Sequence, residues 1–349
     1  MKIGMYLDAR NPPQWRRPWP GHYERLIEWT VEAERRGLGS VWLSEHHFFE
    51  DGYLPQPLTL AAAIAARTSK LRIGTGILVA PLHPAVDIAE QAALVDVLSD
   101  GRLELGLGAG YRIPEFEAFG ADVSRRFSVL EERVAEIRKL WETGLVTPPP
   151  VQESLPLWLG GNGPRAGRIA GRLGVGLLTL RTEPREHYLQ ALRSAGHDPR
   201  TARVSGTVNL VLARDPERAE ANWRRIRPHL AYQWQSYQRY GAQGRPSGKA
   251  DDGALRQVDA SAADPDAMRS AGPEMNAPAF DVVTPAEAAR RLRSWLSDVP
   301  VEHAFFWASI GGMPDDMVEE HLELLATELA PSVRDVGTLL AAAASRDDG

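Results

Sequence analysis

The hydrophobic pattern alternates between short apolar runs and longer amphipathic stretches along most of the chain. Apolar runs rich in β-branched, leucine and aromatic residues, bounded by glycine or polar residues, indicate buried parallel strands. Apolar residues three and four positions apart indicate helices, and the clearest such stripe runs from Phe127 to Trp141. The predicted strands are residues 2–7, 40–44, 71–79, 103–107, 155–159, 175–180, 204–212 and 302–308.

Predicted helices separate most of these strands. A helix is expected to begin at Asp215-Pro216 and another after Thr284, where a proline follows a capping residue. The regular order of strand and helix is typical of an α/β fold with a parallel sheet, and eight strands favour a closed (β/α)8 TIM barrel over an open doubly wound sheet. A long loop is expected between the fourth strand and Phe127. The other predicted helices are residues 22–36, 58–68, 84–98, 164–172 and 315–330.

One stretch interrupts this order before the last strand. Residues 241–281 are dominated by Gly, Pro, Ala, Ser and Asp. This composition is typical of a flexible surface insertion, whereas long loops in compact domains also serve as lids, and both interpretations stay open. No linker divides the rest of the series. We therefore expect a single domain over residues 1–335 and a disordered tail at residues 336–349.

Composition and charge exclude several classes of protein. The 349 residues are 43% hydrophobic and 25% charged, which is ordinary for a soluble globular protein. A net charge of −6 offers no basic surface for nucleic acid, and the absence of cysteine excludes disulfides, thiolate catalysis and iron–sulfur ligation. The N-terminus has no leader pattern, and no apolar run approaches the roughly 20 residues of a membrane span. We therefore expect a cytoplasmic protein without nucleic-acid or membrane partners.

The most informative stretch is residues 40–48, in which a strand ends in Glu45, His46 and His47. Titratable groups at the end of an apolar strand cost free energy unless they are satisfied or used, and barrel enzymes carry their chemistry at these ends. Because strand side chains alternate, the two histidines should point in different directions. The sequence shows no other histidine pair at a useful spacing, so we expect no metal site. A structural hydrogen-bond role is the alternative for either histidine.

Glycine-rich segments follow other predicted strands. The segment from residue 157 runs from a strand through a glycine turn into a helix, where backbone amides and the helix dipole attract an anion. Its spacing matches neither a Walker loop nor GxGxxG, and such turns are also common without a ligand. Small residues at 74–81 and 106–110 either pack tightly or admit a planar ring. The candidate anion-binding residues are Gly160, Gly161, Asn162, Gly163 and Arg165.

Together these segments resemble the bacterial luciferase-like flavin monooxygenase superfamily. The resemblance covers about half of the chain well, and the C-terminal residues 305–325 more loosely. The matching segments are WLSEHHF at 42–48, LRIGTGILVAPLHPAVDIAEQAALVDVLSDGRLELGLGAGY at 71–111, EFEAFG at 115–120 and LWLGGNGPRA at 157–166.

The resemblance implies a (β/α)8 barrel that binds reduced FMN or, in other members, a deazaflavin coenzyme at its strand tips. In the oxygenase branch, reduced flavin and dioxygen form a flavin peroxide that oxidises an organic substrate. The resemblance also implies that His46 is catalytic with Glu45 and His47 beside it, and that a cis peptide near Gly76-Ile77 lies under the flavin ring. The implied cofactor-binding residues are Gly76, Ile77, Gly108, Tyr111, Arg126, Gly160, Gly161, Asn162, Gly163 and Arg165.

One departure from the family pattern concerns the tip of the fourth strand. The luciferase has a cysteine followed by an arginine near the flavin there, and this chain has Gly108 and Ala109. The difference weakens any expectation of light emission and removes one phosphate contact, for which Asn162 and the helix N-terminus would compensate.

The sequence therefore predicts a two-component monooxygenase that receives reduced FMN from a separate reductase, with His46 as the general acid or base. The alternatives are a deazaflavin-dependent hydride-transfer oxidoreductase and a non-catalytic flavin-binding protein. Relatives are commonly dimers through barrel helices, so a homodimer is expected. Large aromatic side chains in a barrel often form plain core, but the candidate pocket walls are Trp42, Phe48, Phe49, Tyr111 and Trp307.

Overall fold

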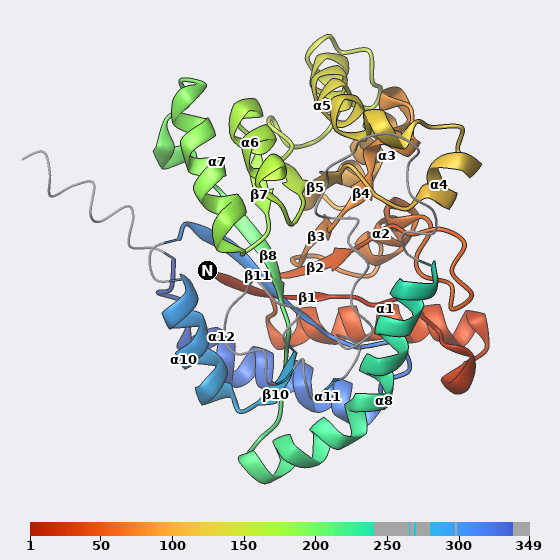
Figure 1. Cartoon of the computed structure of the whole chain (residues 1–349), viewed down its shortest axis with the longest axis vertical. Coiled ribbons are helices and arrows are strands. Elements are labelled where there is room, and N and C mark those ends of the chain that lie inside the picture. The colour runs from red at the N-terminus through yellow and green to blue at the C-terminus, as the bar shows by residue number, and fades with distance from the viewer. Residues whose placement is uncertain (241–264, 266–268, 270–279, 297–298, 338–349) are drawn as a thin grey trace, which may run out of the picture.

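The strands close into a parallel barrel in this computed structural model, which describes residues 1–240, 265, 269, 280–296 and 299–337. Nine strands follow the order β3-β2-β1-β11-β8-β7-β6-β5-β4, and a further pairing of β3 with β5 closes the ring. Since β3 and β4 are consecutive pieces of one barrel position, the nine strands fill eight positions. The fold is therefore the predicted TIM barrel, and helices surround the strands (Figure 1).

The element bounds agree with most of the predicted ones to within a few residues. The barrel strands are β1 (Lys2–Tyr6), β2 (Ser40–Leu43), β3 (Arg72–Thr75), β4 (Leu78–Val79), β5 (Leu103–Gly108), β6 (Leu157–Gly160), β7 (Gly176–Leu178), β8 (Val204–Val208) and β11 (Val301–Trp307). The helices are α1 (Trp19–Arg36), α2 (Pro57–Ala65), α3 (Ala85–Leu98), α4 (Ile113–Ala118), α5 (Arg126–Glu142), α6 (Pro164–Leu173), α7 (Thr182–Ser194), α8 (Pro216–Tyr240), α10 (Pro285–Leu296), α11 (Asp315–Leu324) and α12 (Ala330–Ser332). A π-helical turn, Leu325–Leu329, joins the last two helices.

Two predicted strands are each divided in the structure. The run at 71–79 breaks into β3 and β4 at Gly76-Ile77, whose peptide bond is cis, as the family resemblance implied. The run at 204–212 breaks after β8, and its end, β9 (Leu210–Leu212), leaves the barrel to pair with β10 (Asp281–Val283). An apolar run does not reveal such a break, because the change of pairing partner is decided by segments distant in sequence.

The structure also corrects the prediction of a long loop after the fourth strand. Helix α4 lies within that stretch, and its six residues are too few to show a helical period. Helix α7 likewise had no predicted counterpart. The stretch 241–281, predicted to be an insertion or a lid, lies almost entirely outside the described residues, as do residues 338–349 of the predicted tail. Val336, which the prediction assigned to that tail, is buried.

Glycine and tryptophan residues pack against one another in the interior of the barrel. A Cβ atom on Gly74 would approach the ring of Trp42 to 2.3 Å, and a Cβ atom on Gly176 would approach Trp158 to 2.3 Å. The two indole rings lie 6.1 Å apart at 83° and are almost completely buried. Because these glycines have no side chain, they leave space that the two indole rings occupy. Trp42 is a core residue, so the prediction that it forms a pocket wall was wrong.

A buried histidine occupies the amino-terminal end of the barrel. The Nδ1 atom of His303 lies 3.0 Å from the Oγ atom of Ser40, which also accepts a hydrogen bond from the Trp42 indole at 3.0 Å. Burial, assisted by the positive charges of Lys2 and Arg72, lowers the pKa of His303 to about 3. The His303 imidazole is therefore uncharged in the folded barrel at neutral pH.

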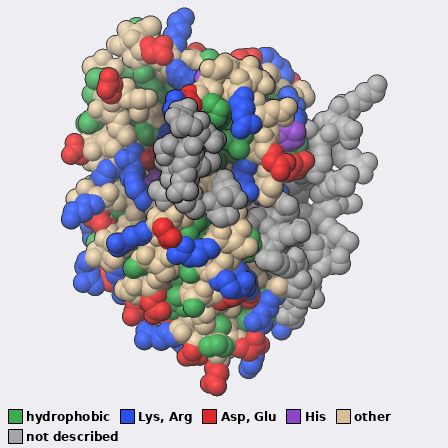
Figure 2. Space-filling model, turned by 90° about the vertical axis from the view of Figure 1, so that its left-hand side faces the viewer, with side chains coloured by type: hydrophobic (Ala, Val, Ile, Leu, Met, Phe, Trp, Pro, Cys, Tyr) green, Lys and Arg blue, Asp and Glu red, His purple; other side chains and the backbone are tan. Residues whose placement is uncertain are grey.

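The outer surface carries both signs of charge. Acidic and basic side chains are interspersed over the face of described residues in Figure 2, in keeping with the modest net charge of −6. Within the described part of the chain, no helix has the length and apolarity to cross a membrane.

We expect acid to destabilise the barrel through His303. Its folded pKa of about 3 lies below the unfolded value of 6.5, so the stabilisation is complete above pH 6.5 and is lost as the pH falls towards 3. Between pH 7 and pH 5 this group costs on the order of 2 kcal/mol of unfolding free energy. Denaturant titrations at both pH values should show a smaller drop in His303→Gln than in the unchanged protein. Equal drops would contradict this role of His303.

Candidate active site

The two histidines that follow β2 have different carboxylate partners, although β2 ends at Leu43 and strand alternation does not extend to them. The Nδ1 atom of His46 lies 3.1 Å from the Oε1 atom of Glu115 on α4. The Nε2 atom of His47 lies 2.7 Å from the Oε1 atom of Glu45. Each imidazole therefore has its own carboxylate partner, and the two pairs have different surroundings.

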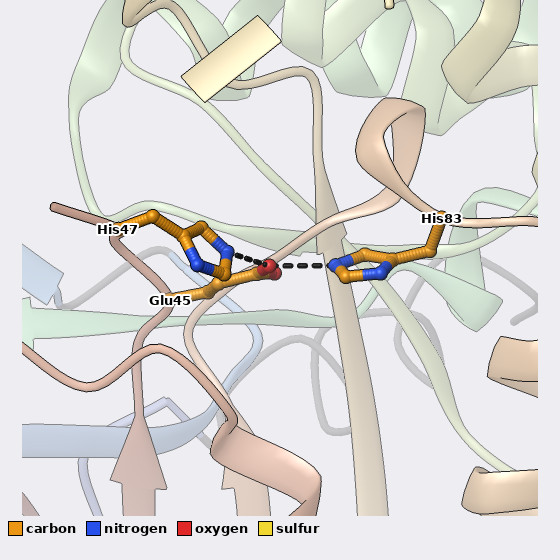
Figure 3. A group of neighbouring side chains, drawn as sticks. All are labelled: Glu45, His47 and His83. Atoms are coloured by element: carbon orange, nitrogen blue, oxygen red, sulfur yellow. Dashed lines mark hydrogen bonds and ion pairs between the residues drawn. The ribbon is translucent and has the colours of Figure 1, made fainter. Parts of the chain in front are cut away.

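Glu45 lies between two imidazole rings. Its Oε1 atom is 2.7 Å from the Nε2 atom of His47 and 2.6 Å from the Nε2 atom of His83 (Figure 3). His83 follows the short 3-10 helix Ala80–Leu82, so the cluster joins the tips of two neighbouring barrel positions. Sequence reasoning missed His83, because a lone histidine in a loop is no signal until the fold brings it to Glu45.

The backbone of Glu45 and its second carboxylate oxygen hold the broken strand β3–β4. The Glu45 amide donates to the Ile77 carbonyl at 3.0 Å, and the Val79 amide donates to the Oε2 atom of Glu45 at 2.6 Å. Burial raises the pKa of the Glu45 carboxyl, but the hydrogen bonds from His47, His83 and Val79, together with the charge of His83, outweigh it and hold the pKa below its ordinary value. Glu45 is thus an ionised clamp on the segment that contains the cis peptide.

The same cluster bears on the question of a metal ion. Glu45, His47 and His83 bring three possible ligand atoms within 4.8 Å of one another, a group that the adjacent His46 and His47 do not indicate in the sequence. The Glu45 oxygen lies between the two rings at hydrogen-bond distance from both (Figure 3). These groups satisfy one another, so the geometry requires no ion.

Aromatic rings surround His46. The ring centroid of His46 lies 4.6 Å from that of Tyr53, 5.3 Å from that of Phe49 and 5.8 Å from that of Tyr111. The buried Tyr53 hydroxyl is 3.1 Å from the hydroxyl of Tyr6, and burial raises the pKa of Tyr53 well above its ordinary value. The surroundings of His46 therefore combine aromatic rings with charged groups, since the guanidinium of Arg10 lies 4.2 Å from the centroid of Tyr53 and that of Arg112 lies 4.7 Å from the centroid of Phe49.

Glu115 is the partner of His46 that sequence reasoning missed. Its side chain is almost completely buried, and its Oε1 atom also accepts a hydrogen bond from the His47 amide at 2.9 Å. The Arg112 guanidinium lies 3.5 Å from the same oxygen and donates to the His47 carbonyl at 2.6 Å. The segment EFEAFG was used only as a family match. Nothing in the sequence distinguishes the buried Glu115 from the exposed Glu117 two positions later.

Ile77 links the tips of three adjacent barrel positions. A Cβ atom on Gly108 would approach the side chain of Ile77 to 2.6 Å, and a Cβ atom on Gly160 would approach it to 2.3 Å. These two predicted cofactor-binding glycines therefore make room for Ile77. Backbone atoms and the Ile77 side chain together form a surface at these strand tips. This surface starts at Gly76, in the segment that Glu45 holds in place.

The predicted anion-binding turn lies beside this surface. Gly163 caps α6, and a Cβ atom placed there would meet nothing within 4 Å. The guanidinium groups of Arg126 and Arg165 lie 4.6 and 4.1 Å from the centroid of the Phe127 ring. The starts of α5 and α6 therefore bring both predicted arginines to the Phe127 ring. Arg165 is exposed at the helix N-terminus, where an anion would bind, whereas Arg126 is 3% exposed and donates to the Val123 carbonyl at 3.1 Å. Asn162 is exposed in the same turn.

The remaining predicted walls have different surroundings. Phe48 is 60% exposed and its nearest aromatic partner is His47, so it does not line the surroundings of His46. Trp307 packs against Tyr6 at 4.5 Å and donates its indole N–H to the Asn209 side chain at 3.0 Å. Phe49 and Tyr111 are the predicted walls that contact His46.

The fold and the site together define a TIM-barrel enzyme with its titratable cluster at the carboxyl ends of the strands. The sequence profile of the family described as luciferase-like monooxygenase matches residues 1–303. The chain therefore belongs to the luciferase-like monooxygenase family, and it is a luciferase-like oxidoreductase.

Individual relatives divide between two cofactors. An F420-dependent glucose-6-phosphate dehydrogenase of Amycolatopsis mediterranei is 31% identical over 231 residues, which span 57% of this chain and 68% of that protein. The oxygenase component of a flavin-dependent trigonelline monooxygenase from Acinetobacter baylyi is 29% identical over 44% of this chain, but the match spans only 47% of that protein. The crystal structure of the monooxygenase RslO1 from Streptomyces bottropensis has a TM-score of 0.72 at 22% identity, covering 95% of this chain and 99% of that one, and shows the shared fold.

We expect Glu45→Gln to destabilise the fold by about 1–3 kcal/mol, because a neutral amide leaves a buried N–H donor facing another donor. Since the folded pKa of Glu45 is below 4.5, its contribution is present above that pH and is lost as the pH falls below it. The difference between the two proteins should therefore shrink in acid.

Denaturant unfolding at neutral and acidic pH measures this difference, with Glu24→Gln on the exposed face of α1 as the matched control. Equal stability of Glu45→Gln and the unchanged protein at neutral pH would disprove the clamp.

Proposed function

We propose that this protein is a flavin-dependent monooxygenase that uses reduced FMN and dioxygen to oxidise a small organic substrate. A separate reductase supplies the reduced FMN. The observation that carries the proposal of a coenzyme with a flat ring and a phosphate is the position of Ile77 across Gly108 and Gly160, since it joins an aliphatic floor to the proposed anion-binding turn. The family description and the trigonelline monooxygenase relative support the oxygenase branch.

The residues at the strand tips fit FMN in two respects. FMN has a flat ring system, which suits the surface formed by Gly76 and Ile77, and a phosphate, which suits the helix N-terminus at Gly163 with Arg126 and Arg165 nearby. A Cβ atom at Gly163 would meet nothing within 4 Å, so the space beside the backbone amides that begin α6 is open. The two features lie on adjacent barrel positions, as a single ligand with an aromatic and an anionic end requires.

The chain's own contribution to the reaction centres on His46. When bound, reduced FMN supplies the electrons that activate dioxygen. His46 transfers a proton between its ring and the reacting oxygen or substrate, as general acid or base. Phe49, Tyr53 and Tyr111 surround the imidazole and keep bulk water from it. Glu45 holds the Gly76–Val79 segment that would support the ring system and has no direct part in the proton transfer.

A second candidate function is hydride transfer with the deazaflavin coenzyme F420. The observation in its favour is the Amycolatopsis mediterranei relative, of which the match spans 68% at 31% identity. The same floor and anion turn suit both coenzymes, because both have a flat ring system and a phosphate. The two candidates therefore differ in the coenzyme and in the need for dioxygen.

The decisive experiment compares binding and turnover with the two coenzymes. We expect the full chain to bind photoreduced FMN more tightly than F420 and to incorporate heavy oxygen from labelled dioxygen into a member of an aldehyde, ketone and N-heterocycle panel. His46→Gln should lower this rate by about 10²–10⁴-fold without weakening FMN binding. His187→Gln on α7 is the matched control and should leave the rate unchanged.

The other outcomes decide against the oxygenase. Tight binding of F420 and anaerobic reduction of it by an alcohol or sugar phosphate would establish the second candidate. Tight FMN binding with no oxidation across the panel would favour a non-catalytic flavin-binding protein. An unchanged rate in His46→Gln would remove the role assigned to that residue.

We also propose that the protein is a homodimer through α3. Val86, Leu94, Val97 and Leu98 on this helix are 37–50% exposed. A group of large apolar side chains on one surface helix is typical of an interface. A second copy of the chain would cover such a face in an isologous contact.

Light scattering after gel filtration tests the dimer. We expect twice the chain mass for the unchanged protein and the monomer mass for Leu94→Glu, because a buried unpaired charge is costly in an apolar interface. Gln190→Glu on α7 adds the same charge elsewhere and should remain dimeric. A monomeric unchanged protein would refute the proposal.

A further inference from the structure

We infer that Glu115 is a positioning residue for His46, acting as the carboxylate that orients the imidazole and selects its tautomer. The inference rests on the proposed role of His46 as general acid or base, and it assigns a task to a residue outside the conspicuous Glu-His-His motif. Glu115 comes from α4, which lies 69 residues further along the chain than His46.

The geometry places one carboxylate oxygen at the centre of the contact. The Oε1 atom of Glu115 is 3.1 Å from the Nδ1 atom of His46 and 2.9 Å from the His47 amide nitrogen. The side chain of Glu115 is 1% exposed and that of His46 is 12% exposed. A buried carboxylate at this distance is a strong acceptor, because little water competes for it.

An acceptor at Nδ1 determines where the ring carries its proton. A neutral imidazole has one N–H and one lone pair, and the hydrogen bond made by one nitrogen selects the form of the other. With Glu115 at Nδ1, that nitrogen carries the proton and the lone pair lies on Nε2. The imidazole can then accept a proton only at Nε2, and the carboxylate stabilises the imidazolium that results.

Two further contacts keep the carboxylate in place. Arg112 lies 3.5 Å from the Oε1 atom and donates to the His47 carbonyl at 2.6 Å, so it ties α4 to the histidine segment. The Oε2 atom of Glu115 is buried and makes no hydrogen bond within the described part of the chain. Within the described residues, every polar contact of the Glu115 side chain is therefore made by its Oε1 atom, which faces His46.

The two carboxylates of the site therefore have separate tasks. Glu45 satisfies His47, His83 and the Val79 amide, all of which hold the fold of the strand tips. Glu115 contacts His46, whose ring packs against Tyr53, Phe49 and Tyr111. A purely structural role of Glu115, confined to the His47 amide, is the competing explanation, and the test must separate the two.

The test combines NMR of the cofactor-free protein with steady-state kinetics. Nitrogen-labelled histidine reports the tautomer of His46, assigned by the loss of its signals in His46→Gln. We expect the Nδ1–H form in the unchanged protein and a shift to the Nε2–H form in Glu115→Met, which has no acceptor. The same variant should lower kcat by about 10–100-fold, since part of the acid–base contribution is lost, and leave KM for reduced FMN within about twofold.

A second variant and a control keep the result interpretable. Glu115→Asp withdraws the carboxylate by about 1.5 Å, one C–C bond, and should release the tautomer even if Glu115→Met fails to fold. Glu117→Met alters an exposed glutamate on the same helix and should change neither readout. An Nδ1–H form that persists in Glu115→Asp, or an equal loss of kcat in Glu117→Met, would overturn the inference.

The two readouts distinguish this inference from the proposed function. The tautomer is measured without any cofactor, so a protein that oxidises nothing but shows the tautomer shift refutes the oxygenase alone. A protein that oxygenates substrate but shows no shift refutes the role of Glu115 alone.

Discussion

The strand-tip site depends on a single buried carboxylate, that of Glu45. It accepts hydrogen bonds from two imidazoles and one backbone amide, and the amide of the same residue holds the carbonyl of Ile77. These bonds join the end of β2 to the break between β3 and β4, where the chain leaves regular pairing. A buried charge with several donors is retained only as a complete set, because removing one partner leaves another unsatisfied.

The floor of the site follows from this constraint. Once the segment at Gly76 is held, Ile77 extends across the next two barrel positions, and glycine at 108 and 160 is required there because a Cβ atom would overlap the isoleucine. A similar arrangement occurs inside the barrel, where the absence of a side chain at Gly74 makes room for the Trp42 ring. Gly74, Gly108 and Gly160 thus make room for neighbouring side chains, and the flat surface at the strand tips results from this packing.

The residues proposed to carry the acid–base chemistry and to bind the anion come from separate segments of the chain. His46 follows β2 and contacts aromatic rings and the carboxylate of Glu115. The anion turn at the start of α6 lies beyond Ile77, with Arg126 and Arg165 brought together at Phe127. One motif in the sequence therefore divides into two functions, a structural clamp and a proposed acid–base group.

The amino-acid sequence by itself determined the barrel, because eight apolar strands separated mostly by helices leave few other ways to bury the strands. It also located Glu45, His46 and His47 at a strand end, and glycine-rich segments marked the tips of β5 and β6. Only the tertiary structure decided which carboxylate meets which imidazole. Glu115 and His83 lie in short or irregular segments, where local patterns carry no information about distant partners. The departure of β9 from the barrel to pair with β10 has the same origin, since strand pairing is a contact between distant segments and leaves no period in either one.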